Sequence, residues 1–205
     1  MKNNSIRNLV FDLGGVILDL SVDTTMEEFS KLSGFSKEKV KHVFNSSPEF
    51  NLYEKGEMDD LNFRNFIRET YAPNASDKAL ERAWNAMLRG IPPVKLDLLN
   101  ALKKTYRVFL LSNTNGIHLD YINANLLPSG AKSLDDYFHT AYYSHRMLKR
   151  KPDAEIYEQV LLENDLKSPE TLFLDDNLSN VEGAKSLGIQ TVHVTHPDLI
   201  LDYFK

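Results

Sequence analysis

The sequence contains no cysteine, and this absence excludes several kinds of chemistry at once. Without thiols the chain cannot form disulfides, thiolate zinc sites or a cysteine nucleophile. Long apolar runs are also missing, since a membrane-spanning helix needs about 20 predominantly apolar residues and no stretch approaches that length. We therefore expect no membrane partner, and any catalysis must depend on other side chains.

Basic charge is scarce as well. The 205 residues include 24 Lys and Arg against 29 Asp and Glu, which gives a formal net charge of −5. A nucleic-acid-binding domain normally carries a basic patch, and none stands out here, so we expect no nucleic-acid partner.

The first residues have some features of a secretion signal, because Lys2 and Arg7 precede an apolar run over residues 9–20. Asp12 interrupts that run, Asp19 lies near its end, and no small-residue cleavage site follows. We therefore predict a cytoplasmic protein.

Four short apolar runs predict buried strands, at residues 8–11, 107–111, 171–174 and 190–194. Runs this continuous are typical of a parallel sheet covered on both faces, rather than of half-exposed strands with alternating polarity. Helical patterns separate the last three. One covers residues 151–164 with Pro152 in its first turn, and another covers 177–187 and ends at Gly188. The predicted fold class is α/β, a doubly wound parallel sheet with right-handed crossovers.

Residues 20–91 differ from the rest, because they contain amphipathic segments and no convincing strand. We predict helices there at 22–32, 37–44, 61–71 and 79–88. The Ile91-Pro92-Pro93 sequence ends this region. We expect residues 20–91 to form an inserted helical domain, and residues 1–19 and 92–205 to form the α/β core.

Polar residues follow three of the four predicted strands directly. Asp12 follows the first, Ser112-Asn113 the second, and Asp175-Asp176 the third. In open α/β sheets ligands bind at the carboxyl ends of the strands. These side chains should therefore converge on one site.

Asp12 leaves its strand into a turn formed by Gly14 and Gly15. A carboxylate at such a point can attack phosphorus and form an aspartyl-phosphate, which splits one hydrolysis into two easier steps. The two glycines let the backbone bend and expose amides to a phosphate. The alternative is a turn aspartate with a structural hydrogen bond.

Asp175 and Asp176 are adjacent carboxylates at the end of an apolar strand, where they repel each other and lose solvation. A divalent cation relieves both problems, and Mg²⁺ prefers oxygen ligands while keeping several waters. The pair therefore predicts a magnesium site. The alternative is that it caps the following helix.

Ser112 and Lys151 are weaker candidates. The Ser112 hydroxyl and neighbouring amides can hold phosphate oxygens, although taken alone a polar loop is the better explanation. Lys151 precedes a predicted helix in Lys149-Arg150-Lys151-Pro152, where a lysine can neutralise phosphate charge. The alternative is a solvated basic cluster.

Taken in order, Asp12, Ser112, Lys151 and Asp175-Asp176 resemble the four motifs of the haloacid dehalogenase-like superfamily, and the resemblance covers nearly the whole chain. The sequence is most similar to the bacterial alpha-D-glucose-1-phosphate phosphatase group. The segments that carry this similarity are Leu111-Ser-Asn-Thr-Asn115 with His118, Lys151-Pro152, Ile156-Tyr157, Val160-Leu161, Asp175-Asp-Asn177, Asn180-Val-Glu-Gly-Ala184, Leu187-Gly-Ile189 and Asp202-Tyr-Phe204.

The resemblance implies a Rossmann-like core with an all-helical cap, and roles for individual residues. Catalysis would fall to Asp12 and Lys151. The metal ligands would be Asp12, the Gly14 backbone carbonyl, Asp176, and Asp175 directly or through water, with Asn180 supporting them. Phosphate would be bound by Ser112, Asn113, Gly14, Gly15 and Lys151.

Two positions depart from the family pattern. Most family phosphatases carry an aspartate two residues after the nucleophile, which protonates the leaving oxygen and then activates water. That position is Gly14 here, as in the glucose-1-phosphatases, and such a site should favour leaving groups that depart easily. A glycine usual shortly before the motif lysine is Leu148, which puts the local loop shape in question.

Within the predicted insert, residues 53–56 interrupt the helical pattern as a loop facing the substrate would. Asp19 and Asp23 could reach a sugar hydroxyl, although an exposed polar loop is the better explanation of each of these segments. Trp84, Phe63 and Phe66 indicate packing between insert helices. Five histidines show no ligand spacing: His118, His139, His145, His193 and His196.

The sequence therefore predicts a Mg²⁺-dependent phosphatase that hydrolyses a small phosphomonoester, such as a hexose 1-phosphate, through an aspartyl-phosphate. We expect a monomer or homodimer. One alternative is a catalytically idle protein that binds phosphorylated metabolites, which Gly14 would suit. A second is a haloacid dehalogenase, although halide displacement needs no acidic pair beside the nucleophile. Gly14 disfavours a phosphoglucomutase, which would need the missing acid.

Overall fold

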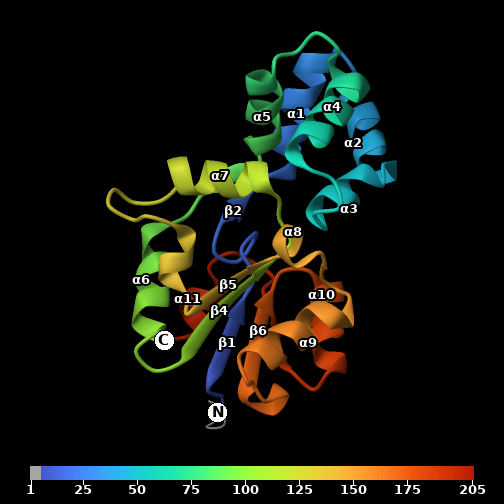
Figure 1. Cartoon of the computed structure of the whole chain (residues 1–205). Coiled ribbons are helices and arrows are strands. Elements are labelled where there is room, and N and C mark those ends of the chain that lie inside the picture. The colour runs from blue at the N-terminus through green and yellow to red at the C-terminus, as the bar shows by residue number, and fades with distance from the viewer. Residues whose placement is uncertain (1–5) are drawn as a thin grey trace.

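The computed structural model describes residues 6–205, so Lys2 and the first five residues of the predicted core lie outside the described part. A parallel sheet with the strand order β5-β4-β1-β6-β7 forms the lower half of the molecule in Figure 1. Its strands are β1 (Asn8–Phe11), β4 (Arg107–Ser112), β5 (Thr140–Tyr143), β6 (Thr171–Asp175) and β7 (Gln190–His193). The central strand β1 pairs with β4 and β6, so the two strands that precede polar residues flank Asp12.

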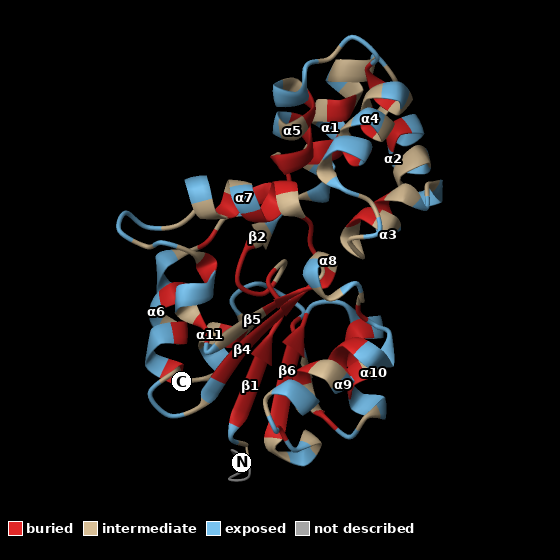
Figure 2. Cartoon of the chain, in the orientation of Figure 1, coloured by how far each residue is buried: buried red, intermediate tan, exposed pale blue. Residues whose placement is uncertain are grey.

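Both faces of the sheet are covered, as the continuous apolar runs predict. Val10, Phe109 and Phe173 belong to one buried cluster, together with side chains of α9 (Ala154–Glu163) and α10 (Leu178–Ser186). Leu9 and Leu110 belong to a second cluster with α6 (Pro93–Leu102), η1 (Leu134–Tyr137) and α11 (Leu199–Tyr203). Figure 2 shows β1 and β6 buried along their length and β4 buried beyond its first residue, between these layers. The fold is therefore the predicted doubly wound α/β fold.

The insert between β1 and β4 is helical and lies above the sheet in Figure 1. Its helices are α1 (Val22–Ser33), α2 (Lys37–Ser46), α3 (Glu49–Glu54), α4 (Asp60–Tyr71) and α5 (Asp77–Asn85). Ser36, Asp59 and Ser76 cap three of these helices, because each side chain accepts a hydrogen bond from the first turn. The predicted domain boundaries at residues 19/20 and 91/92 stay a proposal.

The insert is held together by aromatic side chains, as predicted for Trp84 and Phe63. Their ring centroids lie 4.9 Å apart, and Phe63 stacks on Tyr53 at 3.8 Å. Phe66 lies edge-on to Phe50 at 5.4 Å. Such aromatic pairs contribute about 0.5–1.5 kcal/mol each beyond the area they bury.

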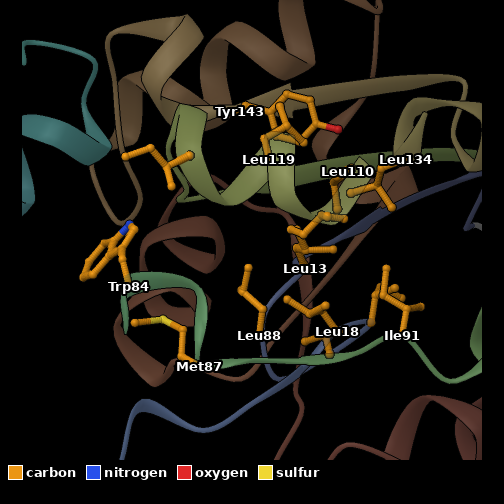
Figure 3. Close-up of a cluster of buried hydrophobic side chains, with 14 of the residues drawn as sticks. Leu13, Leu18, Trp84, Met87, Leu88, Ile91, Leu110, Leu119, Leu134 and Tyr143 are labelled. Atoms are coloured by element: carbon orange, nitrogen blue, oxygen red, sulfur yellow. The ribbon is translucent and has the colours of Figure 1, made fainter. Parts of the chain in front are cut away.

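A short antiparallel pair connects the insert to the core. Asp19–Leu20 forms β2 and Leu88–Gly90 forms β3. Figure 3 shows three side chains in or next to these strands, Leu18, Leu88 and Ile91. They lie within one apolar cluster that also contains Trp84 and Leu110. The core therefore continues from the sheet into the base of the insert.

Several elements differ from the sequence-based expectations. The edge strand β5 was not predicted, and neither were β2, β3 and α3, which contains Tyr53 and Glu54. The predicted helix over 79–88 ends at Asn85, because the following residues form β3. The helix predicted from residue 151 begins at Ala154, since Asp153 has extended backbone angles, and Pro152 therefore precedes the helix.

Three further elements complete the described chain: α7 (Gly116–Asn125), α8 (Ser144–Met147) and η2 (Ser168–Glu170). Among the helices of residues 6–205, none combines the length and the apolar character that crossing a bilayer requires.

Candidate active site

The polar residues that follow β1, β4 and β6 line one cavity of about 350 Å³ between the sheet and the insert. Asp12 extends the sheet hydrogen bonding by one residue, because its backbone N–H donates to the Leu174 carbonyl at 2.9 Å. The sheet itself therefore fixes the position of Asp12 beside the end of β6. The cavity is also lined by the predicted residues Gly14, Ser112, Asn113, Lys151, Asp176 and Asn180.

Lys151 joins the two buried carboxylates of the site. Its ammonium Nζ donates to Asp12 Oδ1 and to Asp175 Oδ2, both at 2.7 Å, and the side chain is only 1% exposed. Burial alone would lower the pKa of Lys151, but the charges of Asp12 and Asp175 outweigh it and the pKa is raised. Lys151 is thus a buried cation, and the surface-cluster alternative does not apply to it.

Burial, together with the charge of Asp175, raises the pKa of Asp12 to about 7 against the opposing effect of Lys151. The pKa of Asp176 is raised too, first by burial and then by Asp175. Three carboxylates share a single ammonium, so the cluster carries an excess of negative charge. A bound cation would oppose both shifts, because it stabilises the charged form of the carboxylates.

Asp175 is fully buried and its two oxygens are occupied by the protein. Asn180 Nδ2 donates to both, at 3.0 and 3.1 Å, and the Asn177 backbone N–H donates to Oδ1 at 2.8 Å. Asp176, in contrast, is exposed and faces the glycine turn. The two adjacent aspartates therefore occupy different environments, and Asp176 is the one free to bind a ligand directly.

Gly15 has the backbone freedom that this turn requires. Its φ is +71°, and a Cβ atom at this position would lie 2.6 Å from Cγ of Asp176. Only glycine combines a left-handed conformation with so close an approach. Gly15 thereby lets the turn after Asp12 pass directly beside Asp176.

Asn113 holds the backbone of Lys151 in a two-way contact. Its Nδ2 donates to the Lys151 carbonyl and its Oδ1 accepts from the Lys151 N–H, both at 2.9 Å. The side chain of Asn113 is therefore engaged with the protein, and its predicted contact with phosphate would have to come from the backbone. Ser112 is 2% exposed and lines the cavity.

Asp12, Asp175 and Asp176 each offer an oxygen atom, and these three atoms lie within 4.8 Å of one another. Mg²⁺ binds carboxylate oxygens at about 2.0–2.1 Å, so its opposite ligands are about 4 Å apart. The three carboxylates thus have both the chemistry and nearly the spacing of a magnesium site. We found no such group among the histidines of residues 6–205.

The insert contributes its own side chains to the cavity, and sequence reasoning identified only part of them. Glu54 lies in the segment predicted to face the substrate, and it forms an ion pair with Arg150 at 2.9 Å. Arg150 was not predicted, since nothing in the sequence separates it from a solvated basic cluster. Asp19 and Asp23 do not line the cavity: they pair with Lys95 at 3.0 Å and Lys37 at 3.2 Å.

The chain matches the family described as haloacid dehalogenase-like hydrolase over residues 9–194. It is 31% identical over 186 residues to the D-ribitol-5-phosphate phosphatase of Bacteroides thetaiotaomicron, covering 91% of this chain and 90% of that protein. It is 27% identical to a sesquiterpene phosphatase of Aspergillus oryzae, over 91% of this chain and 88% of the relative.

Among solved structures, the chain resembles a haloacid dehalogenase-family enzyme of Bacteroides thetaiotaomicron in complex with magnesium and inorganic phosphate. The two are 38% identical with a TM-score of 0.85, covering 91% of this chain and 93% of that one. The fold and the match together define the class: this chain belongs to the haloacid dehalogenase-like hydrolase family. The resemblance drawn from the sequence motifs is thereby confirmed at the level of the family, but not for the glucose-1-phosphatase group.

Proposed function

We propose that this protein is a Mg²⁺-dependent phosphomonoesterase that acts through an aspartyl-phosphate on a small sugar or sugar-alcohol phosphate. One observation carries the proposal: Asp12 lines the cavity, with Lys151 bonded to its Oδ1 and Asp176 close beside it. Phosphoryl transfer to a carboxylate requires a nucleophile, a cation that compensates negative charge and a second acidic residue that binds the metal. Asp12, Lys151 and Asp176 would supply these in turn.

In this proposal an oxygen of Asp12 attacks phosphorus, and the bond between phosphorus and the leaving oxygen breaks. Lys151 holds the other side of the Asp12 carboxylate and compensates negative charge on the transferred group. Asn113 positions Lys151 through its backbone, while Ser112 and the amides near Gly14 and Gly15 would bind phosphate oxygens. Water then attacks the phosphorus of the aspartyl-phosphate, which releases phosphate and restores Asp12.

Asp12, Asp176 and the Gly14 carbonyl would hold Mg²⁺, with Asp175 acting through Lys151, Asn180 or a bridging water. When bound, the metal would neutralise phosphate charge and orient the group for in-line attack. The structure of a relative in complex with magnesium and inorganic phosphate supports Mg²⁺ as the metal.

The relatives favour a phosphate monoester over an organic halide as substrate. Two curated phosphatases match most of the chain, and one of them acts on D-ribitol 5-phosphate. The negative excess of the Asp12, Asp175 and Asp176 cluster also suits a metal-dependent reaction, whereas halide displacement requires none. The cytoplasmic location and the monomeric or homodimeric state stay predictions.

The test is phosphate release from D-ribitol 5-phosphate, glucose 1-phosphate and p-nitrophenyl phosphate, with and without Mg²⁺. We expect chelation with EDTA to abolish turnover and added Mg²⁺ to restore it. Asp12→Asn should lower kcat by at least about a thousandfold, because it removes the nucleophile while retaining the shape of the side chain. Equal rates in wild type and Asp12→Asn would support the idle binding protein instead.

A further inference from the structure

The cavity above Asp12 contains an ion pair that the proposed mechanism does not use. Glu54, the last residue of α3, accepts a hydrogen bond from Arg150 Nη2 at 2.9 Å. Both residues line the same cavity as Asp12 and Lys151. Their side chains are 32% and 27% exposed, so each is partly accessible from the cavity or its mouth.

Arg150 has hydrogen-bond donors beyond the one that Glu54 accepts. Its Nε atom is buried, has no partner among the described residues and is closed to a ligand. The guanidinium carries five N–H donors and its side chain is partly exposed, so its terminal N–H groups are the ones that a ligand oxygen can reach. Glu54 in turn is a carboxylate with lone pairs beyond the one that Arg150 uses, and these would accept from hydroxyl groups.

The remainder of the insert wall offers a leaving group little polar contact. Leu20, Val22, Phe44, Met87 and Leu88 line the cavity from this side, and Leu20 and Val22 are 40% and 46% exposed. Among the described lining residues of the insert, Glu54 is the charged one. Recognition of a polar leaving group from this side therefore depends on Glu54 and its partner.

We propose that Glu54 and Arg150 form a hydroxyl-binding pair that selects a polyhydroxylated leaving group, with Glu54 accepting from one hydroxyl and a terminal N–H of Arg150 donating to a neighbouring oxygen. This inference rests on the proposed function and deepens it. Arg150 directly precedes Lys151, whose Nζ is held by Asp12 and Asp175. Binding at the pair would therefore place the leaving group at a fixed distance from the nucleophile.

The Glu54–Arg150 ion pair could instead have a purely structural role and connect the insert to the core. The chain contains a matched control for that role. Lys55 and Asp153 form a second ion pair at 3.6 Å between the same two segments. Neither residue lines the cavity. A fastening role predicts similar effects from both pairs, whereas substrate selection predicts an effect from Glu54 and Arg150 alone.

The experiment compares Glu54→Gln and Arg150→Gln with Asp153→Asn and Lys55→Gln in steady-state kinetics with saturating Mg²⁺. The substrates are D-ribitol 5-phosphate, farnesyl phosphate (whose leaving group is apolar) and p-nitrophenyl phosphate. We expect Glu54→Gln to lower kcat/KM for D-ribitol 5-phosphate by about tenfold or more, as loss of a hydrogen bond to a charged group does. The rates with the other two substrates should change less than about threefold, and the Lys55 and Asp153 variants should match wild type.

A binding measurement separates this inference from the proposed function. In an Asp12→Asn background, isothermal titration calorimetry with D-ribitol 5-phosphate reports recognition without turnover. A tenfold loss of affinity on adding Glu54→Gln, with the affinity for inorganic phosphate unchanged, supports the pair whether or not the wild type is a phosphatase. Equal losses for ribitol 5-phosphate and phosphate, equal effects from the Asp153 and Lys55 variants, or no effect at all would each overturn it.

Discussion

Position 14 shows how one residue can change the chemistry of the site. Gly14 lies where most phosphatases of this family carry an acid, and a Cβ atom there would lie 2.5 Å from Cδ1 of Leu20. Leu20 lines the cavity and is 40% exposed, so it occupies the space that a longer side chain at position 14 would need. The glycine at position 14 therefore both removes the acid and leaves room for the apolar side chain of Leu20.

This packing predicts that an acid at position 14 fits once the end of the Leu20 side chain turns aside, and that Leu20→Ala removes the contact altogether. General acid catalysis contributes about 10²–10⁴-fold when the leaving group is a poor one. We expect Gly14→Asp with Leu20→Ala to raise kcat on D-ribitol 5-phosphate by about tenfold over Leu20→Ala alone. The gain with p-nitrophenyl phosphate should be small, because its leaving group departs without a proton. A gain of equal size on both substrates would contradict a role as an acid.

At the scale of single residues, the sequence predicted those parts of the site that follow directly from strand ends. Asp12, Ser112 and Asp176 line one cavity because parallel strands bring their carboxyl ends to one edge. The sequence could not predict that Glu54 meets Arg150, because the two residues are 96 positions apart and come from different parts of the fold. Such a contact depends on how the insert sits on the core, which no local pattern encodes.

At the scale of elements, the sequence predicted the strands that are buried on both sides. The runs at 8–11, 107–111 and 171–174 are apolar after their first residue, because neighbouring strands and helices surround them. Strand β5 was not predicted from the sequence, because it is short, lies at the edge of the sheet and begins with half-buried Thr140 and Ala141. Edge strands need fewer apolar residues and so give a weaker pattern.

Leu148 ends the short helix α8 in a conformation that suits glycine. Its φ is 55° and its ψ 32°, which is the left-handed region, and the side chain is 63% exposed. A residue with a Cβ atom is strained there by about 1–2 kcal/mol. Leu148 therefore adopts a backbone conformation that glycine would adopt without strain.

We expect Leu148→Gly to stabilise the protein by roughly 0.5–1 kcal/mol, since relief of strain exceeds the added entropy of the unfolded chain. Urea unfolding monitored by circular dichroism would measure the difference. Leu162→Gly is the control, because Leu162 is also exposed but lies within helix α9, where glycine should destabilise. Destabilisation by both substitutions would show that position 148 is not strained.

At the scale of the whole molecule, His118 joins the insert to the core. Its ring stacks on Trp84 with centroids 4.7 Å apart, and its Nε2–H donates to the Trp84 carbonyl at 3.2 Å. Asn115 Oδ1 accepts from Trp84 Nε1, which turns the Asn115 amide toward His118 Nδ1 as a donor. These contacts fix the neutral tautomer, because a protonated Nδ1 would face another donor.

Burial lowers the pKa of His118 from 6.5 to about 4, despite the hydrogen bond to Trp84. Below pH 6.5 the unfolded chain binds a proton that the folded chain excludes, so this histidine reduces stability as the pH falls from 6.5 to 4. Over that range the effect on the free energy of unfolding amounts to about 3 kcal/mol. Above pH 6.5 both states are neutral at this position, and its contribution to stability no longer depends on pH.

We therefore expect wild type to lose about 2–3 kcal/mol more stability than His118→Gln between pH 7 and pH 4.5. The free energy of unfolding should be measured by urea titration in EDTA, so that metal binding does not contribute. Carboxylates such as Asp12 also titrate in this range, but they are common to both proteins and cancel in the difference. His42→Gln, a change at an exposed histidine, should follow the wild-type curve. Parallel curves for wild type and His118→Gln would mean that the folded protein accepts a charged imidazole at position 118, which would contradict the lowered pKa.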